Sequence, residues 1–151
     1  MNNKPTTAYV LASIIALVVG VGAYGIGLFN ATIQLNEKGY YAIVLLYGLF
    51  SVISLQKSVR DKKENIKTSG LYYLLCWISS GISISLLGIG LYNAEMLLSE
   101  KGFYAMAFVL SLFAAITVQK NVRDNMLFEE EEKEERNSTA SNEFYGELQP
   151  E

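Results

Sequence analysis

Four long apolar blocks without charged side chains limit what this chain can fold into. The blocks cover residues 8–29, 39–55, 71–92 and 102–118, and none contains Asp, Glu, Lys or Arg. Each is close to the length of about 17–25 residues that a helix needs to cross the hydrocarbon of a bilayer. Backbone groups inside lipid must pair within their own segment, and these runs lack the alternation of a transmembrane strand. The sequence therefore predicts an all-α membrane protein with four transmembrane helices.

The first block follows Lys4 and could be mistaken for a secretory signal peptide. Its apolar run of about 22 residues is longer than the roughly 7–15 residues of such a signal. We therefore expect it to be a membrane helix.

The chain is also a tandem duplication. The stretch GLFNATIQLNEKGYYA, which begins at Gly27, aligns without a gap with GLYNAEMLLSEKGFYA, which begins at Gly90. About half of the positions in 27–61 are identical to the aligned positions in 90–124. Each unit reads as helix, short polar loop, helix and charged end, which predicts two tandem helical hairpins. The predicted organisation is a first hairpin in 1–64, a second in 65–128 and an acidic tail in 129–151.

Charge is strongly separated along the chain. The segment 56–70 is basic, whereas 129–135 is almost wholly acidic. Lys and Arg gather at the N-terminus, in the central linker and after the fourth block, and the positive-inside rule then predicts that both termini face the cytoplasm. The acidic tail is poor in large apolar residues, so we expect a disordered cytoplasmic segment after a short helical extension.

The first recurring motif, N-A-x-x-x-L-[N/S]-E-K-G-[Y/F]-Y, fills both hairpin loops. Asparagine suits the C-terminal cap of a helix, Asn36 and Ser99 suit the N-cap of the next, and a glutamate in the first turn is favoured by the helix dipole. The alternative is a paired polar site on the extracytoplasmic face that binds a partner or a hard cation. The candidate residues are Asn30, Glu37, Lys38, Gly39, Asn93, Glu100, Lys101 and Gly102.

The second recurring motif, Q-K-x-V-R-D, ends both units. Its cations lie at the negative end of a helix and can reach the lipid headgroups. Lys57 with Asp61, and Lys120 with Asp124, have the spacing of helix-surface ion pairs. Membrane anchoring explains the motif, and a cytoplasmic docking surface is the functional alternative. The candidate residues are Gln56, Lys57, Arg60, Asp61, Gln119, Lys120, Arg123 and Asp124.

The composition argues against catalysis. The chain has no histidine and one cysteine, Cys76, which suits a small packing residue in an apolar helix. Proton relays and ion pathways usually place ionisable side chains inside the membrane, and the four blocks contain none. We expect no enzyme activity, no catalytic residue, no cofactor, no metal site and no nucleic-acid partner.

The motifs GL[F/Y]NA, LxEKG[Y/F]Y and QKxVRD, in order and in both units, resemble the YiaA/YiaB inner membrane protein family, which is defined by a two-helix domain. The likeness spans residues 8–124 and implies a bacterial inner membrane location with two hairpin domains. It implies no mechanism. Our hypothesis is a structural or interaction role in the envelope, in a stress-related context, with a homo-oligomer or another membrane protein as partner besides the lipid bilayer. The alternative is a small oligomeric channel or transporter.

Overall fold

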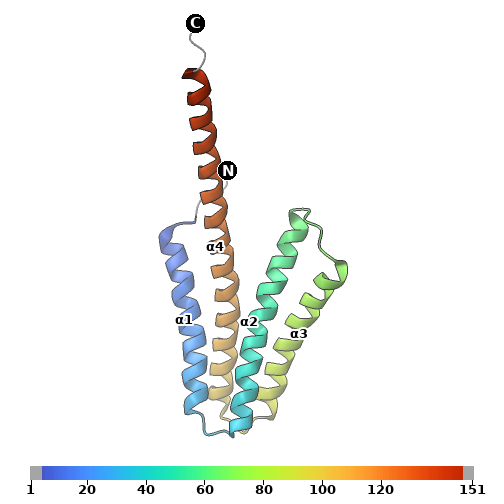
Figure 1. Cartoon of the computed structure of the whole chain (residues 1–151). Helices are drawn as coiled ribbons and strands as arrows, with labels where there is room; N and C mark the ends of the chain where they lie inside the picture. The colour runs from blue at the N-terminus through green and yellow to red at the C-terminus, as the bar shows by residue number, and fades with distance from the viewer. Residues whose placement is uncertain (1–4, 148–151) are drawn as a thin grey trace.

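Four helices make up nearly all of the described chain. The computed structural model describes residues 5–147, with side chains as far as residue 141. All four helices are long and apolar enough to cross a membrane, which confirms the predicted all-α class with four spans. They run up and down in one bundle (Figure 1). Their bounds are α1 Thr7–Asn30, α2 Leu35–Lys63, α3 Gly70–Asn93 and α4 Leu98–Glu147.

The helix ends follow local chemistry. Thr6 caps α1, because its hydroxyl oxygen accepts a hydrogen bond from the backbone N–H of Tyr9. After α2 the chain turns at Asn65, the one described non-glycine residue with a positive φ (57°), a conformation that asparagine tolerates better than most residues. The linker then leads to Ser69, from which α3 begins.

The helices of one repeat are not each other's main neighbours. α1 packs chiefly against α4, α3 packs chiefly against α2, and α2 also meets α4 in the middle of the bundle. In Figure 1 the pair α1/α4 and the pair α2/α3 come together at the hairpin loops and spread apart toward the linker. The two tandem hairpins are therefore interleaved, since the first helix of each repeat lies on the second helix of the other.

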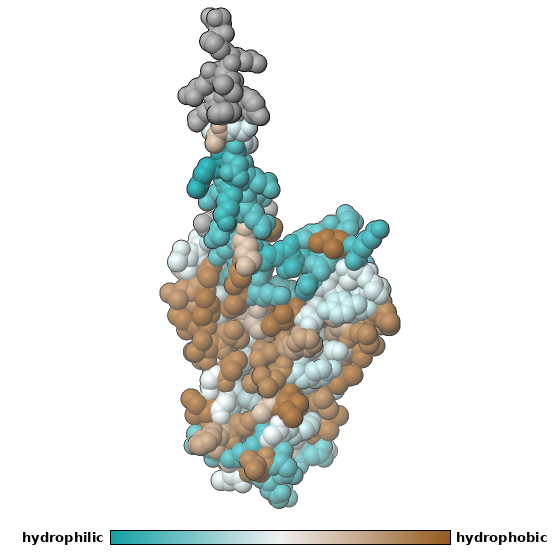
Figure 2. Space-filling view, viewed as in Figure 1, coloured by the Kyte–Doolittle hydropathy of each residue, from teal (hydrophilic) through white to brown (hydrophobic). Residues whose placement is uncertain are grey.

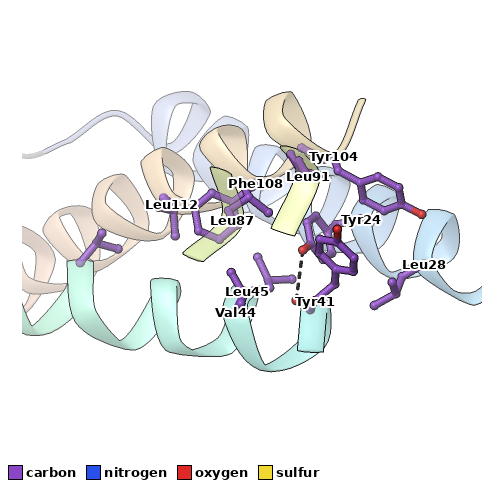
Figure 3. Packing of buried hydrophobic residues seen from close by; sticks show 12 residues of the cluster. Tyr24, Leu28, Tyr41, Val44, Leu45, Leu87, Leu91, Tyr104, Phe108 and Leu112 are labelled. Atoms are coloured by element: carbon purple, nitrogen blue, oxygen red, sulfur yellow. Dashed lines mark hydrogen bonds between the residues drawn. The ribbon is translucent and has the colours of Figure 1, made fainter. Parts of the chain in front are cut away.

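A cluster of buried side chains from all four helices fills the bundle near the loops (Figure 3). Tyr24 and Phe108 are almost fully buried, and the Tyr24 hydroxyl donates to the backbone carbonyl of Tyr41 at 3.1 Å. Gly20 lies against the backbone of Ser111, where an added Cβ would stand 3.0 Å from the amide nitrogen. Small residues let these two helices approach closely without a strong hydrophobic driving force in lipid.

The surface matches a membrane-embedded bundle. On the face shown in Figure 2, brown apolar side chains cover the middle of the bundle, and teal polar side chains lie at the loops, the linker and the extension of α4. Large apolar residues such as Val18, Phe50 and Ile84 are exposed, as expected for side chains that face lipid. Cys76 is buried, in keeping with its predicted packing role.

The structure differs from our expectation for the tail. α4 continues without a break to Glu147, and its side chains from 129 to 141 are exposed. The sequence from 103 to 145 contains neither glycine nor proline. Glu, Lys and Arg are good helix formers, so an acidic composition that lacks apolar residues for a core is still compatible with helix. The expectation of disorder rested on the low hydrophobicity of the tail and did not consider its helix propensity.

Candidate functional sites at the two ends of the bundle

The repeated loop glutamates serve the start of the second helices. One carboxylate oxygen of Glu37 accepts a hydrogen bond from the backbone N–H of Gln34 at 2.8 Å. Glu100, the matching residue of the second repeat, accepts in the same way from Leu97 at 2.9 Å. These donors have no partner within the helix, and a carboxylate in the first turn also meets the positive end of the helix dipole.

The expected N-cap residues were wrong by two positions. α2 begins at Leu35 with Gln34 as its N-cap, and the reciprocal bonds of a capping box join Gln34 and Glu37. Asn36 and Ser99 lie inside the first turn of their helices. A short polar side chain favours a cap in general, but here the glutamate fixes where the helix begins.

The loop asparagines cap the first helices, though not in a left-handed conformation. Asn30 is the last residue of α1, and its side-chain amide donates to the carbonyl of Ile26 at 2.9 Å. Asn93 ends α3 and donates to Ile89 at 2.8 Å. The chain then turns into an extended conformation at the next residue. Each amide therefore gives a second hydrogen bond to a carbonyl near the helix end that already accepts from the helix backbone.

The loop lysines also bind helix ends. The Lys38 ammonium donates to the carbonyl of Phe29 at 2.8 Å, and that of Lys101 donates to the carbonyl of Tyr92 at 3.4 Å. A cation at the negative end of a helix is favourable. Gly39 and Gly102 face open space, because a Cβ on either would meet nothing within 4 Å, and no contact explains why both copies carry glycine.

Two related cavities open at the loop end. Each combines the glycine and asparagine that end the first helix of one repeat with the glutamate and aromatic pair that begin the second helix of the other. The glutamates thus line different cavities, and each already bonds a backbone amide. The first cavity, about 330 Å³, is lined by Gly27, Asn30, Glu100, Phe103 and Tyr104; the second, about 240 Å³, by Gly90, Asn93, Glu37, Tyr40 and Tyr41.

A second polar contact joins the repeats at the linker end. The amide of Asn121 donates to the hydroxyl oxygen of Ser13 at 3.0 Å, and both side chains are buried between α1 and α4. The equivalent positions in the other pair of helices are Cys76 and Ser58, which are also buried. Neither Asn121 nor Ser58 was among the predicted site residues, because both occupy the variable position of the Q-K-x-V-R-D motif. The sequence signal that could have identified them is that both copies carry a polar residue at this position.

The ion pairs of the Q-K-x-V-R-D motif differ from those predicted. Arg123 on α4 binds both carboxylate oxygens of Glu64, the residue after α2, and Arg60 lies 3.7 Å from Asp61. The predicted pairs of Lys57 with Asp61 and of Lys120 with Asp124 do not form among the described residues. Both lysines are exposed, so their ammonium groups stay in water or headgroups.

Comparison with known proteins shows the family to which the chain belongs. The model of the YiaA/B two-helix domain matches twice, over residues 9–61 and 72–124. The chain belongs to the YiaA/B two-helix domain family. It is 57% identical over 127 residues to inner membrane protein YiaA of Escherichia coli K12, covering 82% of this chain and 88% of that one. It is also 36% identical over 63 residues to the uncharacterized membrane protein YubF of Bacillus subtilis 168, covering 41% of this chain and 72% of that one.

No solved structure matches. This YiaA/B protein is a multi-pass inner membrane protein with four spans. Both domain matches end at the aspartate of the Q-K-x-V-R-D motif, Asp61 and Asp124. The extension of α4 lies outside both matched domains.

Proposed function

We propose that this YiaA/B protein has a structural or interaction role in the bacterial envelope and acts through the extension of α4, here called the arm and defined as residues 125–147. The carrying observation is that α4 continues past the bundle as one helix whose side chains from 129 to 141 are exposed. The loop motifs, by contrast, are occupied in capping helices. The arm is thus a polar segment whose exposed side chains are not explained by the packing of the bundle.

A charged helix with no packing partner is marginal in water, because most helical stability in proteins comes from tertiary contacts. Glu130 and Glu134, and Glu131 and Glu135, are like charges four residues apart, and although Lys133 and Arg136 each follow a glutamate by four, residues 129–136 hold six Glu against these two cations, so repulsion remains. A partner with a basic surface would relieve this repulsion and hold the helix. We therefore expect the arm to dock a basic segment of another protein.

The rest of the chain supports a role without catalysis. The four apolar blocks contain no Asp, Glu, Lys or Arg, and the bundle near the loops is filled by buried side chains such as Tyr24 and Phe108. A hydrolytic or redox reaction would need a nucleophile, a base or a cofactor near a cavity. The loop glutamates lie beside cavities, but each already binds a backbone amide.

The arm faces the cytoplasm in this proposal. It lies on the same side as the end of α2, with Lys62 and Lys63, and the linker, with Lys67, whereas the other side carries only Lys38 and Lys101. Inner membrane proteins retain Lys and Arg in cytoplasmic loops. An acidic arm on that side also projects away from the anionic leaflet, which favours a protein partner over lipid.

In-cell photo-crosslinking tests the proposal. A photoreactive residue is placed at position 132 or 136 on the arm, and at 36 or 99, in the first helical turn after each loop, as control positions that are also exposed. Discrete adducts to one foreign protein from the arm, absent from the loops, are expected. A chain that ends at residue 125 should lose co-purification of that protein while it remains in the membrane.

Adducts only from the loops, or the same co-purification with the shortened chain, would contradict an arm-based role. The stress-related context stays a prediction. It requires that a deletion strain lose fitness under envelope stress and regain it with the full chain.

A small oligomeric channel is the second candidate, and one feature favours it. α3 exposes a stripe of small or polar residues at helical spacing, Gly81, Ser85, Gly88 and Tyr92. Such a stripe could line a path between copies. Solute flux in vesicles that Gly88→Leu abolishes and removal of the arm does not would favour this alternative over the interaction role.

A further inference from the structure

The Q-K-x-V-R-D motifs and the linker gather positive charge at one end of the bundle. Residues 56–67 and 119–124, here called the basic end, contain seven Lys or Arg and three Asp or Glu. Gln56 and Gln119 directly follow the apolar runs of α2 and α4. The motif side chains therefore lie at the depth of the lipid headgroups.

The two repeats treat their arginines differently. Arg123 is neutralised by Glu64, which binds it with both carboxylate oxygens. The residue of the second repeat that aligns with Glu64 is Leu127. Arg60 therefore has only the looser contact with its own neighbour, Asp61, at 3.7 Å. One guanidinium of the pair is left without a close anionic partner from the opposite helix.

Both donors and acceptors are left unpaired at this end. Nε of Arg60 and Nη1 of Arg123 are buried N–H donors without a hydrogen-bond partner in the described part of the chain, and the side-chain oxygens of Gln56 and Gln119 are buried acceptors in the same condition. Buried polar groups in folded proteins are normally satisfied. The bond from Arg123 to Glu64 bridges the ends of α2 and α4, which spread apart toward the linker.

We propose that the basic end binds the phosphoglycerol headgroup of an anionic phospholipid between α2 and α4. The phosphate accepts hydrogen bonds from the guanidinium groups, and Arg60 supplies the uncompensated charge. The glycerol hydroxyls donate to the oxygens of Gln56 and Gln119. The exposed ammonium groups of Lys57 and Lys120 add attraction that does not depend on the headgroup. This site is independent of the arm.

The test uses the full chain purified in a neutral detergent, with thermal unfolding followed as lipid is added and bound lipid counted by native mass spectrometry. Phosphatidylglycerol should raise the unfolding midpoint more than phosphatidic acid, which lacks the hydroxyls, and phosphatidylcholine should have no effect. Free glycerol phosphate distinguishes a lipid headgroup from a soluble phosphate as the ligand. If it stabilises the protein as well as the lipid does, the site takes a soluble anion and the lipid proposal fails.

The repeat supplies the variants. Arg60→Gln should weaken phosphatidylglycerol binding about tenfold, the effect of losing one charge-assisted contact. Leu127→Glu should weaken binding similarly, because position 127 aligns with Glu64, and a carboxylate there should neutralise Arg60 as Glu64 neutralises Arg123. Leu127 is 37% exposed, so the change is tolerable. Glu64→Gln frees Arg123 and should strengthen binding. Lys133→Gln on the arm is the control of equal charge change and should leave binding unaltered.

If Arg60→Gln and Lys133→Gln weaken phosphatidylglycerol binding equally, the binding is diffuse electrostatic attraction and the proposed site is contradicted. No preference of the unaltered protein for phosphatidylglycerol over phosphatidylcholine would overturn it outright. If Arg60→Gln fails to fold, the opposite effects expected of Leu127→Glu and Glu64→Gln decide the matter.

Discussion

Gly90 lies directly against the ring of Tyr40, and a Cβ added to the glycine would stand 2.6 Å from the ring carbon Cε1. The same relationship recurs with the repeats exchanged, where a Cβ at Gly27 would stand 2.7 Å from Cε1 of Phe103. Each glycine lies near the end of the first helix of one repeat and touches the second helix of the other. The repeat thus encodes contacts between its copies rather than within each copy.

Gly90→Ala should destabilise the bundle, because the ring it meets cannot simply swing away. The Tyr40 hydroxyl donates to the carbonyl of Leu86 at 2.6 Å and holds the ring in place. Overpacking of this kind costs about 1–3 kcal/mol. The free energy of unfolding in detergent should fall by that amount.

Gly88→Ala is the matched control. A Cβ at Gly88 would meet nothing within 4 Å, and alanine is the better helix former by up to about 1 kcal/mol. This variant should be neutral or slightly more stable. A Gly90→Ala variant as stable as Gly88→Ala would contradict the packing of α3 on Tyr40.

The buried bond between Ser13 and Asn121 should appear as a coupling energy. Hydrogen bonds between membrane helices average about 0.6 kcal/mol, with a maximum of about 1.7 kcal/mol, in double-mutant cycles. We expect a coupling in this range for Ser13→Ala and Asn121→Ala, measured from the unfolding of the single and double variants. Strict additivity of the two substitutions would contradict the contact.

The loop glutamates should behave as structural residues. Glu37→Ala and Glu100→Ala each remove a bond to a helix N-terminus, and the loss of such a cap costs about 0.5–2 kcal/mol. The two losses should be similar, because the repeats make the same bond. Glu95→Ala, at an exposed loop position, is the control and should have no effect on the unfolding midpoint. A large effect on partner capture without any loss of stability would instead favour a binding role.

Much of the fold could be predicted from the sequence. Absence of charge from four blocks of membrane-spanning length is a strong signal, since an unpaired charge in lipid is costly. The gap-free repeat likewise predicted paired loop chemistry, and the equivalent bonds of Glu37 and Glu100 measure 2.8 Å and 2.9 Å. Local motifs with a backbone partner a few residues away are readable because the chain itself sets their geometry.

The pairing of the helices could not be predicted in this way. Short loops favour antiparallel neighbours, yet the contacts that decide packing, such as Gly20 on Ser111, join residues far apart in the chain. Nothing in either helix alone specifies its partner. The bond between Arg123 and Glu64 was missed for the same reason, since helix spacing predicts pairs only within one helix.

Topology follows from the charge distribution and can be measured in cells. In a Cys76→Ser background, a cysteine at Thr32 or Glu95 in the loops should react with a membrane-impermeant thiol reagent in spheroplasts. A cysteine at Thr68 in the linker should react only after the membrane is opened. Labelling of Thr68→Cys in intact spheroplasts would mean that the termini face outward and that the arm is not cytoplasmic.

The interleaved bundle is the central claim, and proximity crosslinking tests it most directly. In a Cys76→Ser background, Ser13→Cys is combined either with Asn121→Cys on α4 or with Val52→Cys, at a similar depth on α2 of the same repeat. A short bifunctional thiol reagent should join positions 13 and 121 within one chain in native membranes and leave 13 and 52 largely unjoined. Efficient joining of 13 to 52, with none to 121, would mean that each hairpin packs on itself and would contradict the interleaved packing.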